Sequence, residues 1–351
     1  MGDFPVRPDE VTAEWLSAVL GAEIAAVDWV PIGTGQVGDS VRFTLQGPSA
    51  GRGVPATLAG KFPSGDATSR ETAALFGLYR KEVLFYRDIA HLLDVRVPHV
   101  HFADTCEEGH RFCLLFEDLG PARQGDQIAG CAIDDARHAI RQAAAIHAPS
   151  WGRHDIIEAD WITVSPAVSE RVALMYPQAQ AIFRERYRDS LEPEFMAVCE
   201  QYAELNAIAA RDQKQPQCLV HGDFRLDNML FDIRGGAEPV AVLDWQTLAP
   251  GNAMTDVGYF LGCGIGQLGL DHEDELLDLY FAEMGGKGVS LDRSALYDDY
   301  RRGIMHGFST AVFSAAFVER TERGDANFLS MARGACALAL KHDSIGVLKE
   351  A

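Results

Sequence analysis

The chain has 351 residues, 47% of them hydrophobic, and its 51 acidic residues outnumber 31 basic residues to give a net charge of −20. This composition excludes a disordered protein, and the length suits two lobes or domains. The acidic excess disfavours nucleic acid as a partner, because a phosphate-binding surface needs a basic excess. The seven cysteines form no C-x-x-C pair, no apolar run approaches 18 residues, and no signal region is apparent. We therefore expect a reduced, cytoplasmic protein with no membrane-spanning segment.

The first third of the chain shows the patterns of a small β-rich lobe. A helix is predicted over residues 9–20, with Gly21 to stop it, and a long amphipathic helix over residues 70–93. Alternating apolar residues and short apolar runs indicate five strands, near residues 27–32, 41–45, 58–62, 100–102 and 111–116. These elements predict a five-stranded antiparallel sheet with one helix, an N-lobe of residues 1–117.

After Gly120 helical patterns dominate. They cover residues 134–147, with Asp134 as the expected N-cap, and then residues 168–212 and 273–348. The only strands predicted here flank a polar loop at residues 221–228. Residues 118–351 are therefore predicted to form a larger, mostly helical C-lobe, and the fold class is α+β.

Three glycines follow the first predicted strand: Gly33, Gly35 and Gly38 fit G-x-G-x-x-G. A dinucleotide-binding fingerprint requires a helix directly after the glycines, but here a strand follows. A glycine-rich hairpin over phosphates fits better, since backbone N–H groups approach phosphate oxygens closely where no Cβ intervenes. An ordinary turn remains the alternative.

The polar loop reads HGDFRLDN, from His221 to Asn228, and Asp244 ends the next apolar run. The spacing H-x-D-x-x-x-x-N is that of a kinase catalytic loop. In phosphoryl transfer Asp223 can orient a hydroxyl and accept its proton. Asn228 and Asp244 offer the oxygen ligands that Mg²⁺ prefers, and we expect them on neighbouring strands of one hairpin.

A lysine and an acid complete this set. Lys61, on the third predicted strand, supplies positive charge for the α- and β-phosphates. Glu82 and Glu71 both lie on the following predicted helix and compete to hold the lysine. We favour Glu82, because it sits mid-helix within EVLFY.

Together these motifs resemble the aminoglycoside phosphotransferase and choline kinase family, a branch of the two-lobed protein-kinase-like fold. EVLFY, LLFEDLG and AIHAPSW resemble its ecdysteroid-kinase-like group, and HGDFRLDN also resembles the phosphotransferase domain of some acyl-CoA dehydrogenase fusions. The similarity runs from about residue 28 to 345.

The resemblance implies an ATP- and Mg²⁺-dependent enzyme that moves the γ-phosphoryl group to a hydroxyl of a small molecule. It implies Asp223 as base, Asn228 and Asp244 as Mg²⁺ ligands, and Asp256 as a brace for the loop. It places the adenine edge near the backbone of Phe116, Glu117 and Asp118.

The sequence leaves alternative roles open for one loop residue and for the protein as a whole. Arg225 either steadies the transferring phosphoryl group or forms a structural salt bridge to Asp227, whereas His221 and His147 are expected to be scaffold. A nucleotide-binding pseudokinase and a hydrolase are the alternatives of another class.

The acceptor is the least defined part. An aminoglycoside is one candidate, because the chain is acidic, but the acids of residues 271–278 and 298–299 fit a solvated outer face. The inner face is expected to form a largely apolar pocket, which favours an uncharged or anionic acceptor with an apolar part. Its expected residues are Leu261, Ile265, Leu268, Phe281, Ile304, Phe308, Val312, Phe313 and Phe317.

Overall fold

The contacts of the chain divide it into two units. Unit 1 contains Met1–Leu92, Arg96–Ala122 and Leu243–Leu248, and unit 2 contains Leu93–Val95, Arg123–Val242 and Ala249–Ala351. The computed structural model describes residues 4–33, 38–51, 53–163, 166–211, 217–318 and 320–350. No helix within these ranges is long and apolar enough to cross a membrane. Unit 1 extends past residue 117 to Ala122 and also contains Leu243–Leu248, whereas Leu93–Val95 belongs to unit 2. The division into lobes at residue 117 stays a prediction.

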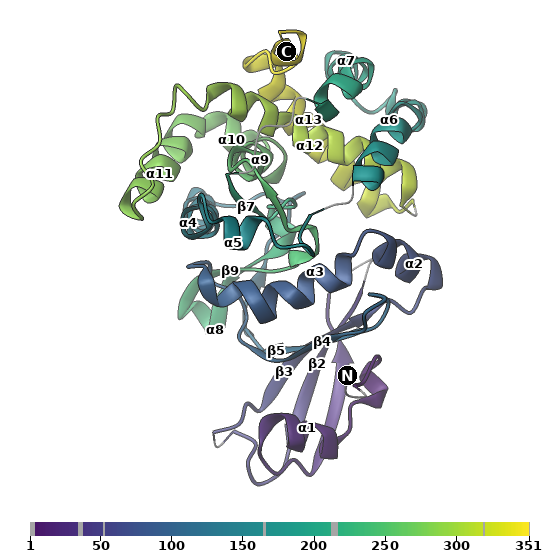
Figure 1. Ribbon diagram of the computed structural model, residues 1–351, viewed down its shortest axis with the longest axis vertical. Helices are drawn as coiled ribbons and strands as arrows, with labels where there is room; N and C mark the ends of the chain where they lie inside the picture. Colours follow the sequence, from purple (N-terminus) through teal and green to yellow (C-terminus); the bar gives the residue numbers. More distant parts are fainter. Residues whose placement is uncertain are drawn as a thin grey trace. The chain divides into compact units, whose positions relative to one another are not determined.

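The predicted five-stranded antiparallel sheet is confirmed in unit 1 (Figure 1). Its strand order is β1-β2-β3-β5-β4, and every pair is antiparallel. The strands are β1 (Ala26–Pro31), β2 (Gly38–Gln46), β3 (Thr57–Pro63), β4 (Val100–Thr105) and β5 (Phe112–Glu117). Lys61 lies on the central strand β3, opposite Ser40 of β2 and Leu114 of β5.

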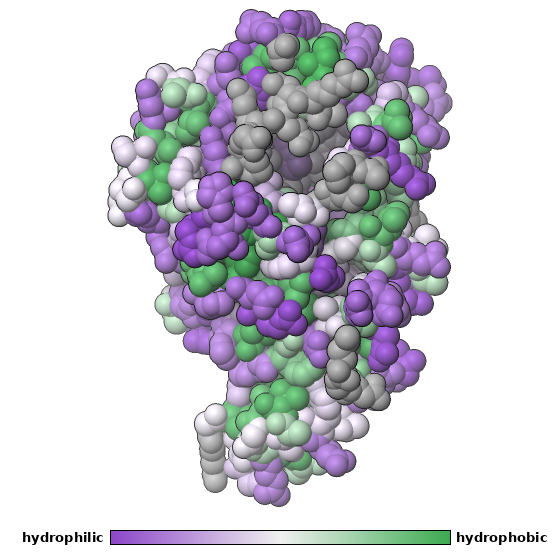
Figure 2. All heavy atoms as spheres, viewed as in Figure 1, coloured by the Kyte–Doolittle hydropathy of each residue, from purple (hydrophilic) through white to green (hydrophobic). Residues whose placement is uncertain are grey.

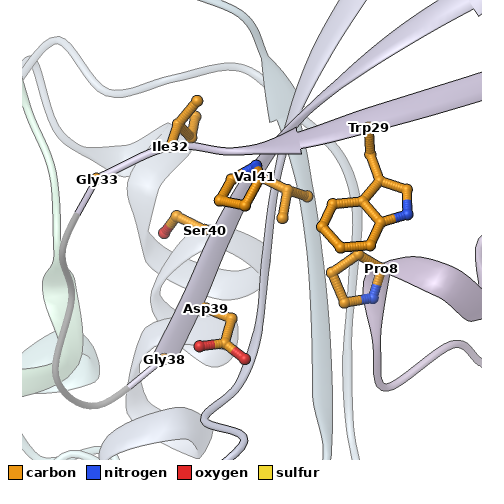
Figure 3. Close-up of a pocket in the computed structure, with 9 residues that line it drawn as sticks. Pro8, Trp29, Ile32, Gly33, Gly38, Asp39, Ser40 and Val41 are labelled. Atoms are coloured by element: carbon orange, nitrogen blue, oxygen red, sulfur yellow. The ribbon is translucent and has the colours of Figure 1, made fainter.

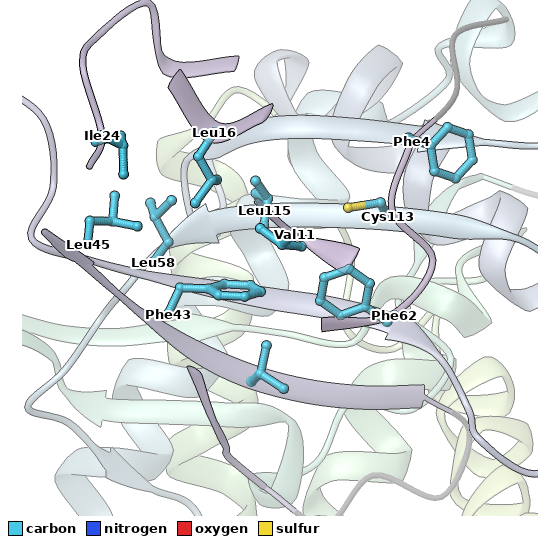
Figure 4. Close-up of a cluster of buried hydrophobic side chains, with 11 residues drawn as sticks. Phe4, Val11, Leu16, Ile24, Phe43, Leu45, Leu58, Phe62, Cys113 and Leu115 are labelled. Carbon is cyan, nitrogen blue, oxygen red and sulfur yellow. The ribbon is translucent and has the colours of Figure 1, made fainter. Parts of the chain in front are cut away.

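One face of this sheet packs on a short helix, α1 (Ala13–Leu20). Alternate residues of β2 and β3 point into this core, as the period-2 pattern of a strand requires. Figure 4 shows the cluster, in which Leu16 of α1 lies among strand residues such as Phe43, Leu58 and Leu115. Burial of each large apolar side chain contributes about 1.5–3 kcal/mol, so this cluster anchors the strand that carries Lys61.

The prediction of one continuous helix over residues 70–93 is wrong. The segment forms α2 (Ala67–Leu75) and α3 (Leu78–Leu84), followed by a π-turn (Phe85–Ile89) and a 3₁₀-turn (Ala90–Leu92). Gly77 separates the helices with a φ of 66°, a left-handed conformation that glycine adopts without steric cost. Leu75, the last residue of α2, is 59% exposed to solvent.

Unit 2 has more strands than the predicted pair. They are β6 (Arg123–Gln124), β7 (Cys218–Val220), β8 (Met229–Asp232), β9 (Glu238–Val242) and β10 (Ala249–Gly251). The strands before and after the polar loop do not pair with each other: β7 pairs with β10, and β8 lies between β6 and β9. Val242 of β9 pairs with Met229 of β8, so Asn228 and Asp244 lie just outside the paired residues of one hairpin.

Helices make up most of unit 2. They are α4 (Ile133–Ser150), α5 (His154–Ile157), α6 (Pro166–Tyr187), α7 (Pro193–Arg211), α8 (Ile233–Gly236), α9 (Met254–Tyr259), α10 (Gln267–Asp271), α11 (Glu273–Gly286), α12 (Tyr297–Phe317), α13 (Glu322–Lys341) and α14 (Gly346–Lys349). The N-cap prediction for Asp134 is wrong, because Ala132 occupies that position and Asp134 lies in the first turn. Gly303 lets α12 press on α9, since a Cβ there would lie 1.8 Å from the Met254 carbonyl oxygen.

Hydrophilic residues cover much of the visible surface, with smaller apolar areas between them (Figure 2). This distribution agrees with a charge of −20 carried mainly by exposed acids.

Candidate active site

Asp256 of α9 holds the start of the polar loop through the backbone. Its Oδ2 accepts a hydrogen bond from the His221 N–H at 2.7 Å, and its Oδ1 accepts one from the Gly222 N–H at 2.9 Å. His147 of α4 lies 3.2 Å from Oδ2 through Nε2, and its Nδ1 lies 2.9 Å from the hydroxyl of Tyr280. Burial alone would raise the pKa of Asp256, but the hydrogen bond and charge of His147 help to hold it below its ordinary value. Both histidines therefore lie where scaffold residues would.

The loop presents Asp223 with its carboxylate fully oriented. Its Oδ1 accepts hydrogen bonds from Arg225 Nε at 2.9 Å and from the Tyr259 hydroxyl at 2.6 Å. Its Oδ2 accepts one from Asn228 Nδ2 at 2.8 Å. Burial would raise the pKa of Asp223, but the charge of Arg225 and these hydrogen bonds hold it at about 2. Asp223 is thus a carboxylate at any physiological pH.

Arg225 lies between two acids of the loop. Its Nη1 donates to Asp227 Oδ2 at 2.9 Å, in addition to the bond from Nε to Asp223. Asp227 in turn accepts the backbone N–H of Gln127 at 3.0 Å, and its Oδ1 lies 3.7 Å from Arg323 Nη2. The salt bridge to Asp227 that we considered is present, and it coexists with one to Asp223.

The sequence patterns did not predict that Tyr259, Gln127 and Arg323 contact the loop. Tyr259 had a usable signal: it follows Asp256 by three residues, and that spacing places both on one side of a helical turn. Gln127 and Arg323 come from segments about 100 residues before and after the loop. Only the packed chain brings them to Asp227.

Asn228 is oriented by Asp223. Its Nδ2 donates to both the backbone carbonyl and Oδ2 of Asp223, each at 2.8 Å. Both amide hydrogens are thereby used, which directs the amide oxygen away from Asp223. Within the parts of the chain that the structure describes, no hydrogen bond reaches that oxygen, so it can serve as a metal ligand.

Lys61 of unit 1 lies between two acids. Its Nζ donates to Glu82 Oε1 and Oε2 at 2.9 and 2.7 Å, and to Asp244 Oδ1 at 2.9 Å. Glu71 is exposed on α2, whereas Glu82 is 1% exposed on α3. Burial alone would lower the pKa of Lys61, but the attraction of Asp244 and Glu82 outweighs it and raises that pKa above its ordinary value. The lysine is therefore a fixed positive charge.

The backbone at Asp244 is unusual. Its φ of 62° places a non-glycine residue in the left-handed region, which costs energy, and strained residues of this kind cluster at functional sites. The neighbouring Trp245 is fully buried and stacks on Phe85, with ring centroids 3.9 Å apart. This stack anchors the segment that carries Asp244 to the end of α3.

The glycine hairpin is partly described. Gly33 has a φ of 77°, and Gly38 opens β2, where a Cβ would lie 2.9 Å from the Phe62 carbonyl oxygen and 3.5 Å from Lys61 Cε. Gly35 lies outside the described residues. A pocket of about 270 Å³ is lined by both described glycines together with Trp29 and Asp39. Figure 3 shows these residues. The pocket is smaller than most small-molecule sites.

The end of β5 carries the residues expected at the adenine edge. Phe116 is buried against Tyr86, with ring centroids 4.7 Å apart. Glu117 accepts hydrogen bonds from the His99 N–H and from Arg96, and Asp118 forms an ion pair with Arg42 at 2.6 Å. All three side chains are thus held within unit 1, and the Glu117 N–H itself donates to the His99 carbonyl oxygen at 2.9 Å. A backbone contact to the adenine edge stays a prediction.

Residues 68–293 match the model of the phosphotransferase enzyme family, and the chain belongs to this family. Shorter stretches match two curated mouse proteins, acyl-CoA dehydrogenase family members 11 and 10, with 42% identity over 48 residues and 49% over 47. These stretches are 14% and 13% of this chain, and only 6% and 4% of the mouse proteins.

Solved structures confirm the kinase-like fold. The ADP-bound aminoglycoside phosphotransferase APH(2'')-Ib is 16% identical with a TM-score of 0.52, over 92% of this chain and 97% of that one. The GDP and kanamycin complex of APH(2'')-IIIa is 14% identical with a TM-score of 0.53, over 93% of both chains. Choline kinase from Cryptosporidium parvum is 11% identical with a TM-score of 0.51, over 90% of this chain and 89% of that one.

Proposed function

We propose that this phosphotransferase moves the γ-phosphoryl group of ATP to a hydroxyl of a small molecule that has an apolar part. The proposal rests on the environment of Asp223, an ionised carboxylate that accepts hydrogen bonds from Arg225, Asn228 and Tyr259. Asp256 holds the loop that carries it. The ADP- and GDP-bound relatives support a nucleotide as the donor.

The environment of Asp223 suits an orienting role with late proton transfer. A carboxylate whose pKa is about 2 is a weak base for an alcohol, so it first fixes the hydroxyl by accepting its hydrogen bond. The acceptor oxygen then bonds to the γ-phosphorus as the bond from phosphorus to the β,γ-bridging oxygen breaks, and the hydroxyl proton passes to Asp223. Oδ2 is the better atom for this step, since Oδ1 already accepts two hydrogen bonds.

Lys61 is proposed to bind the α- and β-phosphates. All three of its ammonium hydrogens are directed at carboxylate oxygens, so a phosphate must replace one of them. The Asp244 side chain is 31% exposed and that of Glu82 is 2% exposed. We therefore expect Asp244 to release Lys61 when the nucleotide binds, while Glu82 keeps it in place.

Asn228 and Asp244 are proposed to hold Mg²⁺. The donor set fits a hard cation: the Asn228 amide oxygen is free to coordinate, and Asp244 can turn toward a metal once Lys61 contacts phosphate. When bound, Mg²⁺ would neutralise charge on the phosphate oxygens.

The charge near Asp223 argues against a polycationic acceptor. Arg225 donates directly to Asp223, and Arg323 reaches the same loop at Asp227. The one additional acid of the described loop, Asp227, is already paired with both arginines. An uncharged or anionic acceptor needs no further acidic partner here.

Most of the residues expected to line an apolar acceptor pocket are buried in the core instead. Five of the nine expected residues are fully packed core side chains: Leu261, Ile265, Ile304, Phe308 and Val312. Phe313 is partly exposed and Phe317 is 45% exposed, with ring centroids 4.8 Å apart. Phe313 follows His306 by seven residues on α12, which places it on the same face about 10 Å further along the helix. These rings are our candidates for the apolar end of the acceptor.

ADP release over a panel of acceptors tests the proposal. The panel contains a kanamycin-type drug, choline, a hydroxysteroid and a hydroxyacyl thioester, each with ATP and Mg²⁺. We expect turnover with the last two classes, and none with Asp223→Ala. Kanamycin turnover with kcat/KM of roughly 10⁴ M⁻¹s⁻¹ or more would identify an antibiotic phosphotransferase instead. ADP release without acceptor would indicate a hydrolase, and nucleotide binding without turnover of any acceptor a pseudokinase.

A further inference from the structure

A cluster of metal-ligand types lies outside the site described above, at the turn between β4 and β5 in unit 1. Cys106, Glu108 and His110 each present one ligand atom, and these atoms all lie within 4.8 Å of one another. Among the described residues, no other group of three His, Cys, Asp or Glu side chains meets this spacing.

The turn itself holds these residues close together. The Cys106 N–H donates to the Arg111 carbonyl oxygen at 3.0 Å, and the Gly109 N–H donates to the Cys106 carbonyl oxygen at 3.1 Å. Gly109 has a φ of 73°, which sends the chain back so that His110 faces Cys106. The Cys106 sulfur also accepts the Arg111 N–H at 3.3 Å. These hydrogen bonds fix the backbone that carries the three side chains.

The geometry points to a tetrahedral metal. Cys106 Sγ lies 3.7 Å from His110 Nδ1. Bonds of about 2.3 Å from Zn²⁺ to sulfur and about 2.0–2.1 Å to nitrogen place these two atoms about 3.6 Å apart at a tetrahedral angle. Glu108 is exposed, so its carboxylate can close the remaining distance by rotation about its side-chain bonds.

The chemistry of the three donors selects among metals. A thiolate with an imidazole suits Zn²⁺, whereas Mg²⁺ and Ca²⁺ prefer oxygen ligands throughout. We propose that the β4–β5 turn binds one Zn²⁺ through Cys106 Sγ, Glu108 and His110 Nδ1, with water as the fourth ligand. The Cys106 thiol loses its proton to solvent as the S–Zn bond forms. The exposure of Glu108 and His110 leaves room for that water.

Cobalt titration of the whole chain, without nucleotide or Mg²⁺, tests this site. Co²⁺ replaces Zn²⁺ in tetrahedral sites, and a thiolate ligand gives it a charge-transfer band in the near ultraviolet. The oxygen donors Asn228 and Asp244 cannot give that band, so the result is independent of the proposed function. We expect one equivalent of Co²⁺ to produce the band and one equivalent of Zn²⁺ to remove it.

Matched variants decide which residues bind. Cys106→Ser should abolish the band, whereas Cys131→Ser should keep it, because Cys131 is the other cysteine that is not fully buried. Glu108→Gln and His110→Gln should weaken Zn²⁺ binding at least tenfold, since even supporting residues contribute about 10–100-fold. Glu107→Gln removes the same charge next to Glu108 and should bind Zn²⁺ as the unaltered chain does. Absence of the band, its persistence in Cys106→Ser, or equal effects of Glu107→Gln and Glu108→Gln would overturn the proposal.

Discussion

Asp223 has a defined place at the centre of the catalytic loop, and its loss should stop the chemistry without loss of the nucleotide. We expect Asp223→Ala to lower kcat by about 10³-fold or more, because the acceptor hydroxyl loses its partner. ATP affinity should stay within a few-fold, since Asp223 acts on the acceptor. Stopped assays and calorimetric ATP titration measure the two quantities. Unchanged turnover would remove Asp223 from the mechanism.

Tyr259 should tune Asp223 rather than bind substrate. Loss of its hydroxyl in Tyr259→Phe removes a hydrogen bond that favours the carboxylate, so the pKa of Asp223 should rise from about 2. A carboxylate with a raised pKa becomes protonated at higher pH. The acid limb of the profile of kcat/KM against pH should therefore shift to higher pH.

The control for this variant is another buried tyrosine. Tyr300 donates its hydroxyl to Glu273 of α11 at a distance of 2.7 Å, and not to Asp223. Tyr300→Phe should leave the acid limb in place. The profiles should be measured between about pH 2 and 8, so that the window includes the pKa of Asp223. Coinciding profiles of the two variants over that range would exclude a role for Tyr259 at Asp223.

Asp244 should matter to the nucleotide more than to the acceptor. Asp244→Ala should lose most Mg²⁺-dependent ATP binding, whereas Asn228→Ala should lose less, because an amide supplies one neutral oxygen. Calorimetric titration of ATP with and without Mg²⁺ distinguishes the two. Identical Mg²⁺ dependence in the unaltered chain and Asp244→Ala would remove Asp244 as a ligand.

Among whole elements, a buried acid ties three helices of unit 2 together. Glu273 of α11 accepts hydrogen bonds from Tyr300 of α12, and from Lys341 and His342 at the end of α13, all between 2.6 and 2.7 Å. We expected this acid on a solvated face together with Asp271 and Asp274. The structure contradicts that expectation for Glu273, which is 4% exposed.

Glu273 should also make stability depend on pH. Burial would raise its pKa, but its hydrogen-bond partners hold that pKa at about 2, below its value of about 4.3 in an unfolded chain. The resulting stability is present above about pH 4.3 and is lost as the pH falls toward 2. Glu273→Gln should cost about 2–3 kcal/mol at pH 7 and flatten this dependence. Urea unfolding at pH 7 and pH 3 measures it, and equal losses at both pH values would contradict the assignment.

For the molecule as a whole, the net charge of −20 should oppose folding at low ionic strength. Raising the salt from about 0.01 M to about 0.15 M shortens the screening length from about 30 Å to about 8 Å, which weakens long-range repulsion. We expect the Tm to rise by a few degrees. Near pH 5, where fewer acids are ionised, the same change should have a smaller effect. A Tm that falls with salt would show that attractive ion pairs dominate.

The sequence alone was enough for the elements whose signal is local. Alternating residues such as Val41, Phe43 and Leu45 predicted a strand, because side chains of a strand point to alternate faces. The spacing from His221 to Asn228 likewise identified a kinase-like loop, because that chemistry needs its groups at set positions along one segment. The break at Gly77 was missed, since an apolar pattern continues across it and a single glycine does not by itself end a helix.

Only the tertiary structure decided which distant groups meet. Glu82 rather than Glu71 reaches Lys61 because Gly77 and the packing of α3 set the direction of each helix, which helical spacing alone leaves open. Tyr259, Gln127 and Arg323 join the loop through contacts between segments up to about 100 residues away, and Leu261 and Phe308 proved to be core side chains. A sequence pattern records which face of an element is apolar, but what covers that face depends on how the elements pack.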